Sequence, residues 1–188
     1  MLEKNSIITI SIIAIVLLLA GYFTFSTIRS NYLANQQQSA AAQSLESQEG
    51  VYTTLDGTEI DLSTFDGQVR VVNSWASWCP FCVNELTDFS TLATEFADKN
   101  VVVLAINRKE KPSLVKAFVD HLSKTEGIVF ILDAADHFYG QIGGFSMPET
   151  IFYDTEGNVV VHKRGFMDLN EMRTHTEKAL LISDELTR

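Results

Sequence analysis

The chain has 188 residues, of which 46% are hydrophobic, so it is long enough for one ordinary domain and an additional segment. It carries 14 Lys and Arg residues against 24 Asp and Glu residues, a formal net charge of -10. Because this charge repels phosphate backbones, the composition argues against a nucleic-acid partner.

The N-terminal segment is strongly apolar. The stretch SIITISIIAIVLLLAGYFTFSTI, residues 6–28, has no charged residue, and about 20 apolar residues suffice for a helix to span a bilayer core. Cleaved signal peptides have shorter apolar runs, roughly 7 to 15 residues. We therefore expect residues 1–28 to be a retained signal anchor and transmembrane helix, with cleavage near Ser39–Ser44 as the alternative. The few flanking charges do not decide its orientation.

A polar segment separates this helix from the rest of the chain. Residues 29–49 are rich in Gln, Ser and Ala and lack a regular apolar period, which is typical of a tether. We therefore expect a single domain over residues 50–188. It opens with VYTTLDGTEIDL, in which Asp56-Gly57 between β-favouring residues predicts a β-hairpin.

The centre of the domain alternates strands and helices. Apolar runs predict strands at 69–75, 101–106 and 128–132. Apolar residues three and four positions apart predict a helix over 80–99, and a second helix is expected over 112–124. This order is typical of a parallel sheet with crossover helices and predicts an α/β domain.

The C-terminal part of the domain predicts a different arrangement. A short helix is expected near 134–143, followed by a strand in SMPETIFYD. The turn TEGN then leads to a return strand, VVVHKR, and a terminal helix is expected over 168–182. We therefore expect the domain to end in an antiparallel strand pair and a helix.

Cys79 and Cys82 are the two cysteines of the chain and stand as Cys-Pro-Phe-Cys after the strand predicted at 69–75. A purely structural disulfide across so short a loop would add only about 2 kcal/mol of stability. A structural zinc site needs four Cys or His ligands. The histidines lie on different predicted elements without ligand spacing: His121, His137, His162 and His175. A copper-binding module remains an alternative, although the sequence places no third ligand.

A redox-active pair that needs no cofactor has a clearer physical basis. Pro80 is well placed as the first helical residue, which puts Cys79 at the helix N-terminus. There the helix dipole and free backbone N–H groups stabilise a thiolate, so we expect Cys79 to be the attacking thiol. Cys82 lies one turn later on the apolar stripe, where it would be shielded and resolve a mixed disulfide. A CxxC that follows a strand and opens a helix is typical of thioredoxin-like redox motifs.

The stretch VVNSWASWCPFCVNE, together with SMPET, resembles the TlpA/ResA-like branch of the thioredoxin superfamily over about residues 50–181. This resemblance implies a thioredoxin-like fold, a central mixed sheet flanked by helices. It also implies a cis bond at Met147-Pro148 facing the cysteines, with the backbone before the proline pairing with the substrate chain. Trp78 is expected at the rim beside Cys79.

Two polar residues near the cysteines follow from the same resemblance. Glu85 matches an acid that the branch carries after its CxxC. Its position, three residues from Cys82, predicts partial desolvation, a raised pKa and proton exchange with that thiol; the alternative is a solvated helix glutamate. Asn73 stands where cytoplasmic-type thioredoxins carry a buried acid, which leaves proton handling to Glu85.

Family members of this branch are membrane-tethered thiol-disulfide oxidoreductases. The resemblance therefore implies a domain on the extracytoplasmic face of the cytoplasmic membrane, exported disulfide or dithiol proteins as substrates, and a membrane thiol as electron donor. Reduction is the expected direction, with cytochrome c maturation as a precedent.

Two departures from the branch pattern leave alternatives, at Pro80-Phe81 and at the residues on either side of Pro148, while Ala76 argues against a related class of enzyme. The order Pro80-Phe81 resembles disulfide-forming enzymes, so an oxidase stays open. Glu149 after the proline is unusual, and would either oppose ionisation of the thiol or point outward. A peroxidase of the superfamily would carry a threonine three residues before its cysteine, where this chain has Ala76.

Overall fold

The computed structural model describes residues 21–27, 29 and 51–186. The chain divides into two units between Glu49 and Gly50. In the first unit, residues 21–27 and 29 are helical. Most of the transmembrane helix predicted over 1–28 and of the tether predicted over 29–49 lies outside the described residues. Among the residues that are described, no helix has the length and apolar character needed to cross a membrane.

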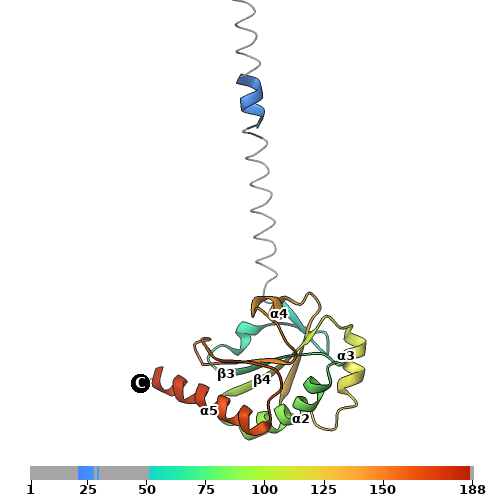
Figure 1. The fold of residues 1–188 in the computed structure, drawn as a ribbon, viewed down its shortest axis with the longest axis vertical. Coiled ribbons are helices and arrows are strands. Elements are labelled where there is room, and N and C mark those ends of the chain that lie inside the picture. The colour runs from blue at the N-terminus through green and yellow to red at the C-terminus, as the bar shows by residue number, and fades with distance from the viewer. Residues whose placement is uncertain (1–20, 28, 30–50, 187–188) are drawn as a thin grey trace, which may run out of the picture. The chain divides into compact units, whose positions relative to one another are not determined.

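The second unit is built on one seven-stranded sheet (Figure 1), with strand order β2-β1-β5-β4-β3-β6-β7. Its three central strands β5, β4 and β3 are parallel, whereas the other neighbouring strands are antiparallel. The strand bounds are β1 Val51–Thr54, β2 Glu59–Asp61, β3 Val69–Trp75, β4 Val101–Arg108, β5 Ile128–Asp133, β6 Glu149–Tyr153 and β7 Val159–Arg164. The mixed sheet expected from the sequence is therefore confirmed.

The antiparallel pair β1 and β2 extends the sheet beyond β5. The connecting turn closes with a 3.0 Å hydrogen bond from the Gly57 N–H to the Thr54 carbonyl. Gly57 has a φ of 88°, in the left-handed region that glycine adopts without a Cβ clash. The Asp-Gly dipeptide thus lies at the turn of this pair.

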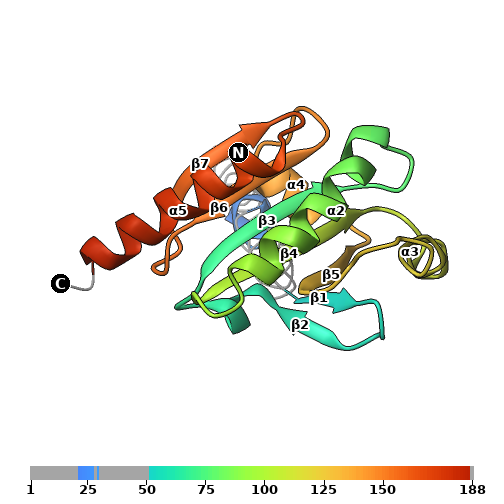
Figure 2. The same ribbon diagram turned by 90° about the horizontal axis from the view of Figure 1, so that it is seen from below.

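Helices cover both faces of the sheet (Figures 1 and 2). Three of them, α2 (Pro80–Glu95), α3 (Pro112–Val119) and α5 (Leu169–Leu186), pack on one face. The short helix α4 (His137–Gln141) and the 3-10 helix η1 (Leu62–Phe65) lie on the other. Side chains alternate along β4, so Val103 and Ala105 face α2 while Leu104 and Ile106 face α4. Burial on both faces explains the continuous apolar runs of the central strands.

Two helices are shorter than the sequence predicts. The helix expected over 112–124 ends at Val119, because the N–H groups of His121 and Leu122 bond to carbonyls three residues back and close the last turn. No residue from 120 to 127 is buried, so the apolar stripe has also ended. The helix expected over 80–99 ends at Glu95, before Asn100 takes a left-handed φ of 55°.

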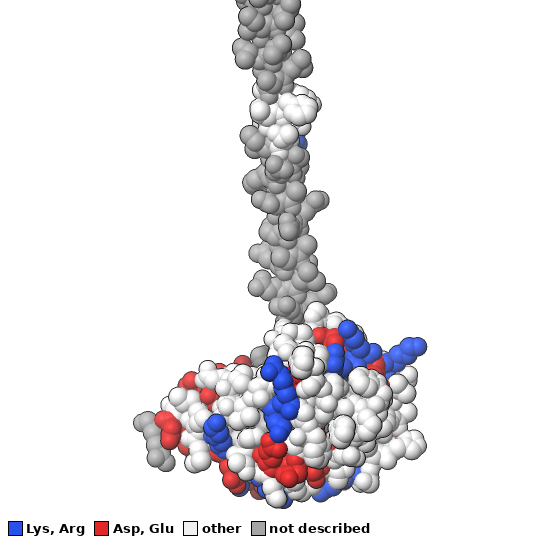
Figure 3. All heavy atoms as spheres, in the orientation of Figure 1, with Lys and Arg blue, Asp and Glu red and all other residues white. Residues whose placement is uncertain are grey.

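Charged side chains are spread over the face of this unit that Figure 3 shows. On the face seen in Figure 3, acidic and basic side chains occur in several small groups. The excess of acidic residues behind the net charge of -10 therefore forms no single continuous patch on that face.

Candidate active site

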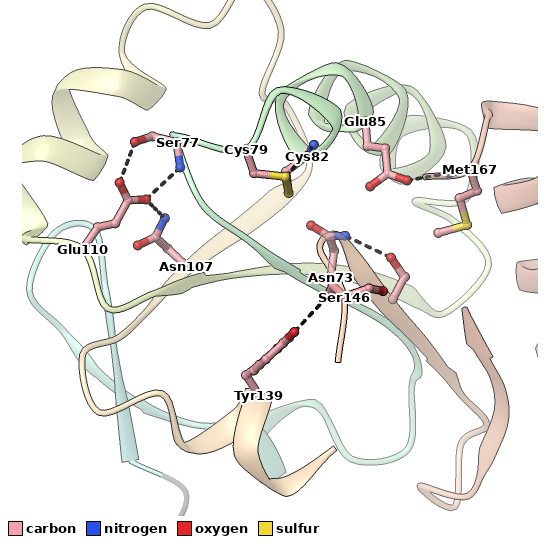
Figure 4. Close-up of a disulfide and its surroundings, with 11 residues drawn as sticks. Asn73, Ser77, Cys79, Cys82, Glu85, Asn107, Glu110, Tyr139, Ser146 and Met167 are labelled. Carbon is pink, nitrogen blue, oxygen red and sulfur yellow. Dashed lines mark hydrogen bonds between the residues drawn. A yellow bond between two sulfur atoms is a disulfide. The ribbon is translucent and has the colours of Figure 1, made fainter. Parts of the chain in front are cut away.

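Cys79 and Cys82 are joined by a disulfide at the start of α2, with their Cα atoms 5.3 Å apart (Figure 4). Cys79 is the N-cap residue of α2, and its sulfur accepts a 3.3 Å hydrogen bond from the Cys82 N–H. The predicted position of Cys79 at a helix N-terminus, with Pro80 in the first turn, is confirmed. Cys79 is 5% exposed and Cys82 is 0% exposed, so Cys79 is the more accessible of the two residues.

Apolar side chains of the sheet and of α2 and α3 pack together with the disulfide. Both cysteines belong to one buried cluster with Trp75, Ala76, Leu86, Ala105, Val115, Val119, Phe130 and Leu132. The Trp75 ring lies 5.7 Å from the ring of Phe118 and 5.9 Å from that of Phe130, which fixes the end of β3. Trp78 is 65% exposed, so it contributes to the surface next to Cys79 rather than to this packing.

The peptide bond between Met147 and Pro148 is cis, as the family resemblance implies. Pro148 is buried, and the half-buried Met147 packs against the cluster that contains both cysteines. The structure therefore brings Met147 close to a disulfide that lies almost seventy positions earlier in the sequence.

Glu85 is a fully buried carboxyl on α2, not a solvated glutamate. Its Oε1 accepts a 2.7 Å hydrogen bond from the Met167 N–H, while its Oε2 has no hydrogen-bond partner among the described residues. Burial raises the pKa of Glu85 from 4.5 to about 8, although the Met167 hydrogen bond lowers it in part. The expected raised pKa is confirmed, and Glu85 holds a proton at neutral pH.

Asn73 lies on β3 below the disulfide (Figure 4). It is fully buried, and its Nδ2 donates a 2.9 Å hydrogen bond to the Thr150 Oγ1 on β6. Because an amide does not ionise, this position supplies no charge and no titratable proton to the thiols. Glu85 is then the buried acid on the helix that carries the cysteines.

Glu110 has a role at the site that the sequence did not indicate. Its carboxylate accepts hydrogen bonds from the Ser77 N–H at 2.7 Å, the Ser77 hydroxyl at 2.5 Å and the Asn107 Nδ2 at 2.7 Å. These bonds connect the loop after β4 to the segment that leads into Cys79 (Figure 4). Glu110 stands in NRKEKP, where a charged residue is expected to be solvated, so no sequence signal pointed to it.

Glu149 does not point outward, which was one of the two orientations expected from the sequence. The side chain is 0% exposed, because Glu149 begins the buried strand β6. Its Oε1 accepts hydrogen bonds from the Phe145 and Ser146 N–H groups, and its Oε2 lies 2.8 Å from the His162 Nε2 on β7. The carboxylate is therefore directed at the loop before Pro148 and at β7.

These features make the disulfide suited to thiol exchange. One sulfur lies at a helix N-terminus, where backbone N–H groups stabilise a thiolate. The second sulfur is buried behind it, and a protonated carboxyl lies one helical turn further along α2. Among the described residues, no three His, Cys, Asp or Glu side chains are grouped as a metal site would require.

Comparison with known proteins gives a consistent result. Residues 37–180 match the family model described as Redoxin. The chain is 28% identical over 167 residues to the thiol-disulfide oxidoreductase ResA of Halalkalibacterium halodurans, covering 88% of this chain and 90% of that protein.

Two solved structures share the fold. The pneumococcal exposed lipoprotein thioredoxin of Streptococcus pneumoniae is 26% identical with a TM-score of 0.60, and the match covers 68% of this chain and 97% of that one. A thiol:disulfide interchange protein DsbE from Chlorobium tepidum has a TM-score of 0.62 at 22% identity, covering 69% and 92%. The fold of residues 51–186 is therefore thioredoxin-like.

Proposed function

The chain belongs to the Redoxin family, and from this membership we propose that it reduces disulfides in exported proteins with the Cys79–Cys82 pair. It is a thiol-disulfide oxidoreductase, like the relatives that share most of its length. The observation that carries the proposal is the position of the disulfide, with Cys79 at the N-terminus of α2 and Cys82 fully buried one turn later.

The proposed reaction begins with the reduced enzyme. The Cys79 thiolate attacks one sulfur of the substrate disulfide, forms a mixed disulfide, and releases the other substrate sulfur as a thiolate. The Cys82 thiol then loses its proton and attacks the Cys79 sulfur. This step breaks the mixed disulfide, releases the substrate as a dithiol after protonation, and leaves the Cys79–Cys82 disulfide seen in the structure. Two electrons have passed to the substrate, and a membrane thiol donor returns two to the enzyme.

Glu85 is proposed to accept the proton of Cys82 during the second step through its ionised form, which is the minor form at neutral pH because the pKa lies above 7. The pKa of Glu85 is about 8, close to the ordinary thiol value of about 8.5. Proton transfer between groups of matched pKa changes the free energy little, which suits a group that must both accept and return a proton. The position of Glu85 one turn after Cys82 on α2 supports this role.

The direction of electron flow is tested by the reduction potential of the pair. A potential close to that of thioredoxin, about −270 mV, or lower would support the reductase. The second candidate is an oxidase, favoured by the proline directly after Cys79. A potential close to that of the periplasmic oxidant, about −120 mV, would refute reduction and support the oxidase.

We propose that the uncharged stretch 6–28 anchors the chain in the cytoplasmic membrane and places the thioredoxin-like domain on the extracytoplasmic face. Maturation of c-type cytochromes is the proposed process. The location of the domain is tested by protease treatment of cells whose envelope outside the cytoplasmic membrane has been removed. We expect the protease to digest the domain, and we expect the chain in untreated cells to stay in the membrane fraction. Protection of the domain from the protease, or release of the chain by a carbonate wash, would contradict the proposal.

A further inference from the structure

The loop before the cis bond, residues 143–147, is held by side chains on both of its sides. From α4, the Tyr139 hydroxyl donates a 3.0 Å hydrogen bond to the Ser146 carbonyl (Figure 4). From β6, the Glu149 Oε1 accepts hydrogen bonds from the Phe145 N–H at 2.6 Å and the Ser146 N–H at 2.7 Å. Both main-chain groups of Ser146, the residue before Met147, are therefore fixed by long side chains.

The Glu149 carboxylate is itself fixed by the sheet. It lies on the first residue of β6, which pairs with the last residue of β7, Arg164. Its Oε2 lies 2.8 Å from the His162 Nε2, and the Arg164 Nε lies 3.6 Å from its Oε1. Two neighbouring strands thus set the position of the acceptor that the loop binds.

A buried carboxylate needs such partners, because removing a charge from water costs several kcal/mol when it is unpaired. Burial raises the pKa of Glu149, but the loop N–H groups and His162 outweigh it, so the pKa lies below its ordinary value. The side chain is therefore ionised at neutral pH. Hydrogen bonds to an ionised acceptor are about twice as strong as neutral ones, which gives the loop a firm attachment.

We propose that Glu149 is a positioning residue for polypeptide substrates, which holds the loop 143–147 so that the Met147 main chain stands ready beside the cysteines. The inference rests on the proposed function and deepens it. The hydrogen bonds of the Glu149 carboxylate go to the loop and to β7, while Met147 packs against the cysteine cluster. Glu149 therefore acts through the loop rather than on the sulfur atoms.

The loop matters only for substrates that have a main chain to pair with it. An extended peptide gains affinity from main-chain hydrogen bonds to the protein, so a displaced loop weakens peptide binding. A small disulfide without peptide groups reacts with the sulfur of Cys79 and makes no use of the loop. Loss of Glu149 should therefore separate the two kinds of substrate.

The test compares the full-length reduced protein and three variants in detergent. Glu149→Leu removes the acceptor, Glu149→Gln keeps an amide oxygen that accepts both loop N–H groups, and Tyr139→Phe removes only the bond to the Ser146 carbonyl. Each protein reduces a synthetic peptide with one intramolecular disulfide and, separately, hydroxyethyl disulfide.

We expect Glu149→Leu to raise the KM for the peptide about tenfold, the effect of losing charge-assisted bonds, with kcat nearly unchanged. Its rate with hydroxyethyl disulfide should stay within about twofold, because this small disulfide forms no hydrogen bonds with the loop. Glu149→Gln should bring the peptide KM part of the way back to the wild-type value, because its neutral amide oxygen accepts the same bonds more weakly. Tyr139→Phe should raise the peptide KM about threefold, as expected for one neutral hydrogen bond. The amide proton signals of Phe145 and Ser146 should shift more in Glu149→Leu than in Glu149→Gln, because only the second variant keeps an acceptor for them.

Equal losses with both substrates, an unchanged peptide KM, or a failure of Glu149→Gln to rescue would overturn the inference. Should Glu149→Leu not fold, Tyr139→Phe decides: a loss confined to the peptide supports the inference, and no loss overturns it. A wild-type protein that reduces neither disulfide would overturn the proposed function together with the inference, whereas an active wild type with insensitive variants overturns the inference alone.

Discussion

Replacing Glu85 with glutamine should stabilise the protein, and the gain should grow with pH. Glu85 is fully buried on α2, and its Oε1 accepts a hydrogen bond from the Met167 N–H. A glutamine keeps this acceptor and the shape of the side chain but does not ionise. The substitution therefore removes the proton equilibrium of Glu85 and leaves the packing nearly intact.

The size of the gain follows from the pKa of Glu85, which is about 8 in the folded protein and 4.5 for an ordinary glutamate. Below pH 4.5 the carboxyl is neutral in both states and has no effect on the free energy of unfolding. Between pH 4.5 and 8 the folded state binds more protons than the unfolded chain, so stability falls as pH rises. The loss is about 1.4 kcal/mol per pH unit, or about 5 kcal/mol in total.

The assay is urea unfolding of the oxidised protein between pH 5 and pH 9, followed by tryptophan fluorescence. The free energy of unfolding of Glu85→Gln should be close to that of the wild type at pH 5 and should exceed it by a few kcal/mol at pH 9. Glu95→Gln is the matched control on the same helix. Its hydrogen bonds with Arg173 lower the pKa of Glu95, so this variant should gain nothing at alkaline pH.

A difference between Glu85→Gln and the wild type that stays constant over this pH range would refute the reasoning. It would mean that Glu85 has an ordinary pKa in the folded protein, so that its pKa would not match that of the Cys82 thiol and the proposed proton exchange would lose its basis.

Other predictions concern the cysteines and their supporting loop. Cys82→Ser should accumulate mixed disulfides on Cys79, visible on non-reducing gels of membrane extracts, and none should form in a Cys79→Ser control. In the reduced protein, the pH dependence of alkylation should give a pKa for the Cys79 thiol below about 8.5, and Cys82 should react more slowly because it is buried; equal rates would contradict the assigned roles. Glu110→Ala should lower the free energy of unfolding by about 2 kcal/mol, the effect of losing charge-assisted hydrogen bonds, and urea titration would detect it; an unchanged midpoint would show that Glu110 does not hold the Ser77 segment.

Much of the fold could be predicted from local patterns in the sequence. The strand predicted at 69–75 is β3 with the same bounds, because apolar residues on both faces mark a central strand. Cys79 at the start of α2 was equally predictable, since proline prefers the first turn of a helix. Such features depend on residues within one or two turns of each other.

Long-range contacts of the site could not be predicted in the same way. Glu85 binds the Met167 N–H across 82 residues of sequence, and Glu110 binds Ser77 across 33. A carboxylate that is buried by the fold looks like any surface carboxylate in the sequence, because its partners are main-chain groups of distant loops. From the sequence, Glu149 was expected either to oppose ionisation of the thiol or to point outward. Neither expectation included its contacts with the loop N–H groups and with His162.

The two edge strands of the sheet determine how readily a foreign chain can pair with it. On one side, β2 has only three residues and carries Glu59 and Asp61; on the other, β7 ends in Lys163 and Arg164. Short or charged borders discourage a foreign strand from joining the sheet. We therefore expect a thiol-disulfide oxidoreductase with this sheet to resist coaggregation with other polypeptide chains.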